Sequence, residues 1–132
     1  MATTPEGKVK ARVDAILSRH TNVIVNPMTM GFGKSGVVDK LTCISGMFIA
    51  IETKTIQATG AKRYPTKLQY RFMASVLREG GYVAIINESN VDELERWISH
   101  LEPTPNDFNK PLMFDGCQHP FDGEKAATLT SA

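Results

Sequence analysis

Apolar and polar positions repeat along the chain with spacings that predict seven regular elements. Three segments have apolar residues at helical spacing, and they cover residues 4–20, 66–81 and 90–100. Four shorter runs, rich in β-branched residues and bounded by Gly, Asn or Pro, predict strands at residues 22–26, 37–44, 47–54 and 82–87. The expected order is αβββαβα. It indicates an α/β fold with a central mixed sheet flanked by helices.

The expected helices begin with capping signals. Thr4 precedes a proline at the first helical position and an acid in the first turn. Thr66 with Gln69, and Asn90 with Glu93, have the spacing of a capping box. These signals place the three helix starts.

The end of the chain lacks such patterns. Residues 103–132 hold four prolines and few periodic apolar positions. We therefore expect one domain over residues 1–102, followed by an irregular acidic tail.

A predicted β-hairpin carries the strongest chemical signal. Two residues, Ser45-Gly46, separate its strands, and the register of such a loop places Asp39 opposite Glu52. Directly opposed like charges are destabilising, and Lys54 follows on the same face as Glu52. A divalent cation would satisfy both carboxylates through the hard oxygen ligands that it prefers.

The alternative is a surface ion cluster on a solvated sheet face. We favour the metal site because the other residues expected on that face are apolar, namely Leu41, Cys43, Phe48 and Ala50. The inference depends on the register, since a longer loop would break the pairing.

Charge is distributed unevenly along the sequence. Residues 1–78 hold 12 Lys or Arg against 4 acids, whereas residues 79–132 hold 3 against 10. Residues 53–78 contain no acid, and their basic residues are Lys54, Lys62, Arg63, Lys67, Arg71 and Arg78. Such a surface beside a carboxylate site suits a nucleic acid, although solvated basic residues alone are common.

Two further polar residues point toward the hairpin. On a helical wheel Glu6 falls within the apolar arc of its helix, so it either faces the site or serves the helix dipole. Gln69 lies between apolar positions of the second helix, where it can cap the helix and also reach the site.

Two further motifs give weaker evidence of function. Gly33-Lys34-Ser35 resembles the end of a phosphate-binding loop but lacks the required first glycine and the following helix. Lys34 and Ser35 stay candidate phosphate contacts, although a role as a flexible entry to the hairpin is the favoured interpretation. Cys117-x-His119 is half a zinc site at most, and we regard it as incidental.

Compartment and membrane association follow from simple counts. The chain has two cysteines, which is no disulfide framework and favours a reducing compartment. It has neither a signal peptide nor an apolar run long enough to span a bilayer. We expect a cytoplasmic protein without a membrane partner.

Four segments together resemble the PD-(D/E)XK nucleases, in particular the small stand-alone VRR-NUC domains of phages. They are Gly36–Asp39, Phe48–Lys54, Pro65–Gln69 and Gly80–Ile86. The resemblance covers residues 4–101 and implies a restriction-endonuclease-like core. It also implies an Mg²⁺- or Mn²⁺-dependent DNA endonuclease. The family's usual proline is Val38 here, which alters the start of a strand more than the chemistry.

The resemblance also implies roles for individual residues. Asp39 and Glu52 would bind the metal, with the carbonyl of Thr53, and Lys54 would orient or activate the attacking water. Glu6 matches the acid of the first helix and would join the metal ligands, and Gln69 matches the helical glutamine and would join the catalytic residues.

The implied substrate is branched DNA such as a Holliday junction, cut by a homodimer. Two alternatives remain open, namely a non-catalytic DNA-binding module and a sequence-specific restriction or homing nuclease on the same core.

Overall fold

The fold is a mixed α/β arrangement built on one five-stranded sheet. The computed structural model describes residues 4–27, 37–103 and 110–121. Its elements are α1 (Pro5–Ser18), β1 (Ile24–Val25), β2 (Lys40–Ile44), β3 (Met47–Thr53), the 3-10 helix η2 (Gly60–Arg63), α2 (Lys67–Arg78), β4 (Tyr82–Ile86), the 3-10 helix η3 (Val91–Glu93), α3 (Leu94–Ser99) and β5 (Leu112–Met113).

The strands lie side by side in their order along the chain. β1, β2 and β3 pair in antiparallel fashion, whereas β3, β4 and β5 are parallel. The parallel link between β3 and β4 is a crossover that contains η2 and α2. β3 is therefore the strand at which the sheet changes from antiparallel to parallel pairing.

The predicted hairpin and its two-residue turn are confirmed. Ser45 and Gly46 have φ values of 51° and 82°, the left-handed values that a type I′ turn requires at both central positions. Ile44 pairs with Met47, and the register continues to Lys40 opposite Ile51. Asp39 lies one residue before β2, next to the end of this ladder.

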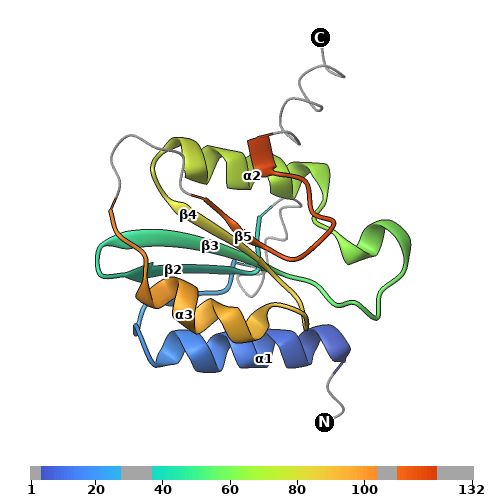
Figure 1. The fold of residues 1–132 in the computed structure, drawn as a ribbon, viewed down its shortest axis with the longest axis horizontal. Coiled ribbons are helices and arrows are strands. Elements are labelled where there is room, and N and C mark those ends of the chain that lie inside the picture. Colours follow the sequence, from blue (N-terminus) through green and yellow to red (C-terminus); the bar gives the residue numbers. More distant parts are fainter. Residues whose placement is uncertain (1–3, 28–36, 104–109, 122–132) are drawn as a thin grey trace.

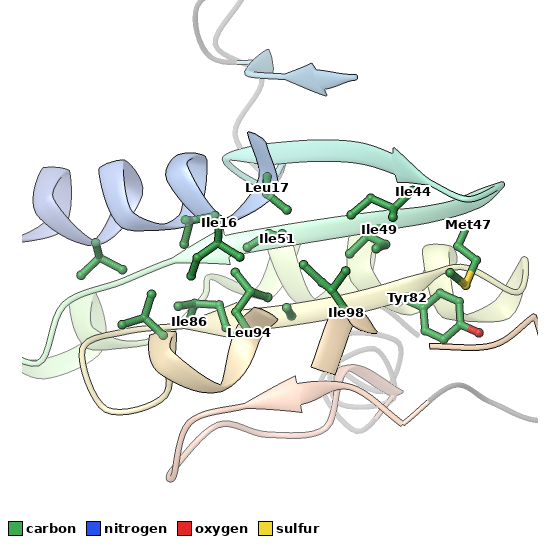
Figure 2. Packing of buried hydrophobic residues seen from close by; sticks show 14 residues of the cluster. Ile16, Leu17, Ile44, Met47, Ile49, Ile51, Tyr82, Ile86, Leu94 and Ile98 are labelled. Atoms are coloured by element: carbon green, nitrogen blue, oxygen red, sulfur yellow. The ribbon is translucent and has the colours of Figure 1, made fainter. Parts of the chain in front are cut away.

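Helices cover both faces of the sheet (Figure 1): α1 and α3 pack on one face, and α2 packs on the other. Figure 2 shows the larger core cluster between α1, α3 and the sheet, where the alternate strand residues Ile49 and Ile51 meet Leu17 and Leu94. The second cluster joins α2 to the opposite face through residues such as Ala50.

The first two helices start where the capping signals indicate. The Thr4 hydroxyl accepts the N–H of Gly7 at 3.0 Å. Thr66 and Gln69 form the full capping box, with distances of 3.1 Å and 2.9 Å for the two reciprocal bonds.

The prediction of a third capping box, formed by Asn90 and Glu93, is wrong. Asn90 makes no capping bond, and the chain instead passes through η3 before α3 begins. The side chain of Asn90 is buried and accepts the N–H of Asn87 at 2.9 Å, while it donates to the carbonyl of Ile85 at 3.0 Å. Asn90 therefore stabilises the turn after β4 rather than the helix.

The expectation of an irregular tail from residue 103 is wrong for residues 110–121. Leu112 and Met113 form β5, which pairs with Ala84 and Ile85 of β4. Phe114 is buried in the α2 cluster and stacks on Tyr64 with ring centroids 6.0 Å apart. Segments on both sides of the expected boundary at residue 102 thus share one sheet.

No helix in the described parts of the chain is long and apolar enough to cross a membrane.

Candidate active site

The candidate site lies where β3 ends beside β4. Glu52 is the last but one residue of β3 and is 1% exposed. Lys54 follows the strand and donates its main-chain N–H to the carbonyl of Ile86 at 2.9 Å. The carboxyl end of parallel strands is a common position for binding sites in α/β sheets. Of the acids in the described residues, the most buried one thus lies at that edge.

Both oxygens of the Glu52 carboxylate have partners. Oε1 accepts the main-chain N–H of Asp39 at 3.1 Å, and Oε2 lies 3.1 Å from the ammonium of Lys54. The side chain of Lys54 is itself 14% exposed. The predicted proximity of Asp39, Glu52 and Lys54 is therefore present in the structure.

The environment of Glu52 raises its pKa to about 7 from 4.5. Burial is the largest cause, because it disfavours the charged form, and the negative charge of Asp39 adds to it. The ion pair with Lys54 acts in the opposite direction without cancelling the shift. A buried carboxyl that titrates near neutral pH is a typical property of functional sites.

Asp39 is oriented differently from the expectation. Its carboxylate does not meet that of Glu52 squarely across the ladder, because Asp39 precedes β2 and its side chain turns to Thr53. Asp39 Oδ2 accepts the N–H of Thr53 at 3.2 Å and its hydroxyl at 2.6 Å. Asp39 Oδ1 lies 3.5 Å from the ammonium of Lys10.

The face that carries Glu52 is buried only in part. Ala50 is buried beside it, but Phe48 is 45% exposed and Cys43 is also exposed. The burial of Glu52 comes from the α2 side of the sheet, where Val83 and its neighbours form the second core cluster. The residues expected on this face are apolar, as predicted, but Phe48 and Cys43 leave part of the face exposed to solvent.

The donor set fits a magnesium-type ion. Mg²⁺ is usually held by one or two carboxylates, with waters and substrate phosphates completing its shell. Asp39 and Glu52 supply two carboxylates of this kind beside each other. The described residues contain no group of three or more His, Cys, Asp or Glu side chains that could hold a metal.

Glu6 and Gln69 occupy the positions that their capping roles explain. Glu6 is a half-buried acid in the first turn of α1. Gln69 uses its side-chain carbonyl to accept the N–H of Thr66, as a capping box requires. Direct roles of these two residues at the site stay predictions, as does metal binding by the Thr53 carbonyl.

Four of the expected nucleic-acid contacts are exposed on neighbouring elements. They are Lys62 and Arg63 of η2, and Lys67 and Arg71 of α2. The remaining two, Lys34 and Ser35, lie outside the described residues.

Basic residues in α1 and just after it behave differently from those of α2. Arg12 pairs with Asp92, and both Arg19 and His20 pair with Glu95, at 2.8 Å and 3.0 Å. Acids from the second half of the chain thus pair with Arg12, Arg19 and His20. Among the described residues, no acid forms an ion pair with Lys62, Arg63, Lys67 or Arg71, which are exposed.

Sequence reasoning missed two residues near the site. Lys10 comes from α1, four residues after Glu6, and that spacing would have placed both on one helix face. Glu88 follows β4 and accepts the Thr55 hydroxyl at 2.5 Å and the N–H of Ile56 at 2.9 Å. Glu88 therefore fixes the segment directly after Lys54.

The bonds to Glu88 also affect its charge. Burial acts to raise the pKa of Glu88, but the hydrogen bonds from Thr55 and Ile56 outweigh it and lower the pKa. Glu88 is thus held as a carboxylate.

Cys117 and His119 have other neighbours than each other. Burial raises the pKa of the Cys117 thiol to about 11, beside the hydroxyl of Tyr70. His119 Nδ1 accepts the N–H of Phe121 at 3.3 Å.

No protein-family model matches this chain, and searches of curated proteins and of solved structures also find no match.

Proposed function

We propose that this protein is a metal-dependent DNA endonuclease of the PD-(D/E)XK type, with a restriction-endonuclease-like core and branched DNA as its substrate. The proposal rests on the motif resemblance together with the geometry at the end of β3. It uses Mg²⁺ or Mn²⁺ as the cofactor. The same resemblance implies a homodimer, which the mass of the protein in solution tests.

The observation that carries the proposal is the environment of Glu52. This carboxylate is 1% exposed and lies next to a second acid and a lysine. Burial of such a charge costs free energy unless a bound ligand compensates it. Its pKa, raised to about 7, means that the free protein holds this carboxyl only partly ionised at neutral pH. A bound cation would compensate the charge that burial disfavours.

The metal would be held by the Asp39 and Glu52 carboxylates. When bound, it would supply Lewis-acid stabilisation of a phosphate oxygen and lower the pKa of a bound water. The residues that hold these carboxylates in place are Thr53, through its N–H and hydroxyl to Asp39, and Lys54, through its ammonium to Glu52.

Lys54 would serve the reaction directly. Its ammonium is 3.1 Å from Glu52 Oε2, and its main chain is anchored to β4 through Ile86. A lysine held in this way donates hydrogen bonds toward an attacking water and toward the charge that develops on the phosphate. The main-chain anchor fixes the point from which its side chain extends.

The exposed basic residues of η2 and α2 would contact the DNA backbone. Lys62, Arg63, Lys67 and Arg71 are all exposed and follow Lys54 in the chain. Phosphate contacts of this kind provide affinity that depends strongly on salt concentration.

The deciding experiment compares a four-way junction with a linear duplex of the same sequence. The parental protein should cut the junction in Mg²⁺ or Mn²⁺ and not in EDTA. Glu52→Gln and Lys54→Met should each abolish cutting while sparing most of the binding. Glu79→Gln and Lys8→Met make the same charge changes at exposed positions and serve as matched controls.

Three results would count against the proposal. Cutting by Lys54→Met at the parental rate would show that the assigned site is wrong. Salt-sensitive binding without cutting in any divalent metal would favour the non-catalytic module. Equal or faster cutting of one linear sequence would favour a restriction or homing nuclease.

A further inference from the structure

The longest contact of the carboxylate pair points to a residue outside the motif. In the described part of the chain, the partners of Asp39 and Glu52 lie at 2.6–3.2 Å, except Lys10, whose ammonium is 3.5 Å from Asp39 Oδ1. Asp39 Oδ2 is already engaged by Thr53. Oδ1 is therefore the oxygen that an incoming cation can take with the least loss.

Lys10 can leave this position without disturbing the helix that carries it. The side chain of Lys10 is 38% exposed, whereas that of Asp39 is 15% exposed. The neighbouring Val9 and Val13 are buried and hold α1 against the sheet. Lysine has a flexible stem and a compact ammonium with three donors, so its head group can move while α1 stays fixed.

We propose that Lys10 is the intramolecular cation that a divalent metal displaces from Asp39, and that its ammonium then binds a phosphate of the DNA backbone beside the site. This inference rests on the proposed function, and it adds one residue, Lys10, that couples metal binding to DNA binding. Lys10 competes with the metal when DNA is absent and supports DNA binding once the metal is bound.

The charges explain the direction of this coupling. Asp39 and Glu52, when ionised, balance the ammonium groups of Lys10 and Lys54, so the cluster has no net formal charge. A divalent ion adds two positive charges while both lysines remain nearby. The released ammonium and the metal repel each other, and a phosphate placed between them would be attracted to both.

The test uses two lysine variants on the same helix. Lys10→Met removes the competing ammonium, and Lys8→Met makes the same change at an exposed position two residues away, on another side of α1. Free Mn²⁺ is measured by electron paramagnetic resonance without DNA. Junction binding is measured in Ca²⁺ at several salt concentrations, with a denaturing gel to verify that the DNA stays intact.

We expect opposite effects on the two ligands. Lys10→Met should bind Mn²⁺ about two- to fivefold more tightly than Lys8→Met, as expected for loss of a partly exposed ion pair. It should also bind the junction more weakly than Lys8→Met and reduce the salt slope by about one. Equal Mn²⁺ affinity in the two variants, or equal junction affinity, would overturn the role of Lys10.

The parental protein and Glu52→Gln separate this result from failure of the proposed function. If the parental protein binds Mn²⁺ through Glu52 and cuts the junction, a negative result in Lys10→Met concerns Lys10 alone. If the parental protein and Glu52→Gln bind Mn²⁺ equally and neither cuts, the metal site itself is wrong and the role of Lys10 is overturned with it.

Discussion

Asp39 meets Glu52 through its main chain, since the N–H of Asp39 donates to Glu52 Oε1 at 3.1 Å. The carboxylate of Asp39 is turned away to Thr53. The two acids are therefore neighbours, but their side chains do not project from the same face of the hairpin. This arrangement keeps Glu52 buried and lets Asp39 Oδ1 reach toward α1.

Glu52→Gln should change how stability depends on pH. In the parental protein the pKa is 4.5 for the free side chain and about 7 when folded, so the folded state binds more protons between these values. Stability should fall as the pH rises from about 4.5 to about 7 and lose about 3 kcal/mol through this group. Urea unfolding at pH 5 and pH 8 without divalent ions should show Glu52→Gln gaining stability relative to the parental protein at the higher pH. If the difference in stability between Glu52→Gln and the parental protein were the same at pH 5 and at pH 8, the raised pKa would be contradicted.

Glu88→Ala should slow DNA cleavage more than it weakens DNA binding. Removal of Glu88 frees the Thr55 hydroxyl and the Ile56 N–H, so the segment after Lys54 loses its anchor. Small displacements of a reacting group are costly, and we expect kcat to fall about tenfold or more with little change in KM. Steady-state cleavage of a junction provides both constants. Glu79→Ala removes an exposed acid and should match the parental kcat, and an equal loss in both variants would point to charge alone.

Asn90→Ala should lower the free energy of unfolding by about 2–4 kcal/mol. The change leaves two buried main-chain groups, the N–H of Asn87 and the carbonyl of Ile85, without their partner. Each unsatisfied buried group costs about 1–3 kcal/mol. Urea denaturation measures the loss, with Asn22→Ala as the same change at an exposed position for comparison. A loss below 1 kcal/mol would show that Asn90 contributes little to the turn.

Phe114→Ala should destabilise the whole domain, because Phe114 is buried against Tyr64 in the α2 cluster. Truncation of a well-buried phenylalanine costs about 3–5 kcal/mol. Lys110→Ala, at an exposed position, should have almost no effect. A single cooperative transition at lower urea is expected. If Phe114→Ala unfolded at the same urea concentration as the parental protein, residues 110–121 would be dispensable for folding.

Local signals made much of the fold predictable. The Thr4 and Thr66 caps and the Ser45-Gly46 turn depend on residues within four positions of each other, so the sequence alone contains the relevant chemistry. β5 has no such signal. It is two residues long and exists because β4 offers it an edge. Asn90 failed as a cap for a related reason, since the turn after β4 uses its side chain.

The candidate site was predictable only to the level of neighbours. The hairpin register brought Asp39 beside Glu52, but alternation along a strand stops applying at Asp39, which precedes β2. The contacts of Lys10 and Glu88 depend on how α1 and β4 pack against β3. Such contacts between distant segments require the tertiary structure.

The change of pairing at β3 has a consequence for the order of folding. The β2–β3 hairpin closes through a two-residue turn, so Asp39 and Glu52 can approach each other at small entropic cost. The contacts of Lys54 with Ile86, and of Glu88 with Ile56, wait for the long crossover to bring β4 alongside. Contacts of greater sequence separation form more slowly. During refolding, the paired acids should therefore assemble early, and the full site should be among the last parts of the molecule to form.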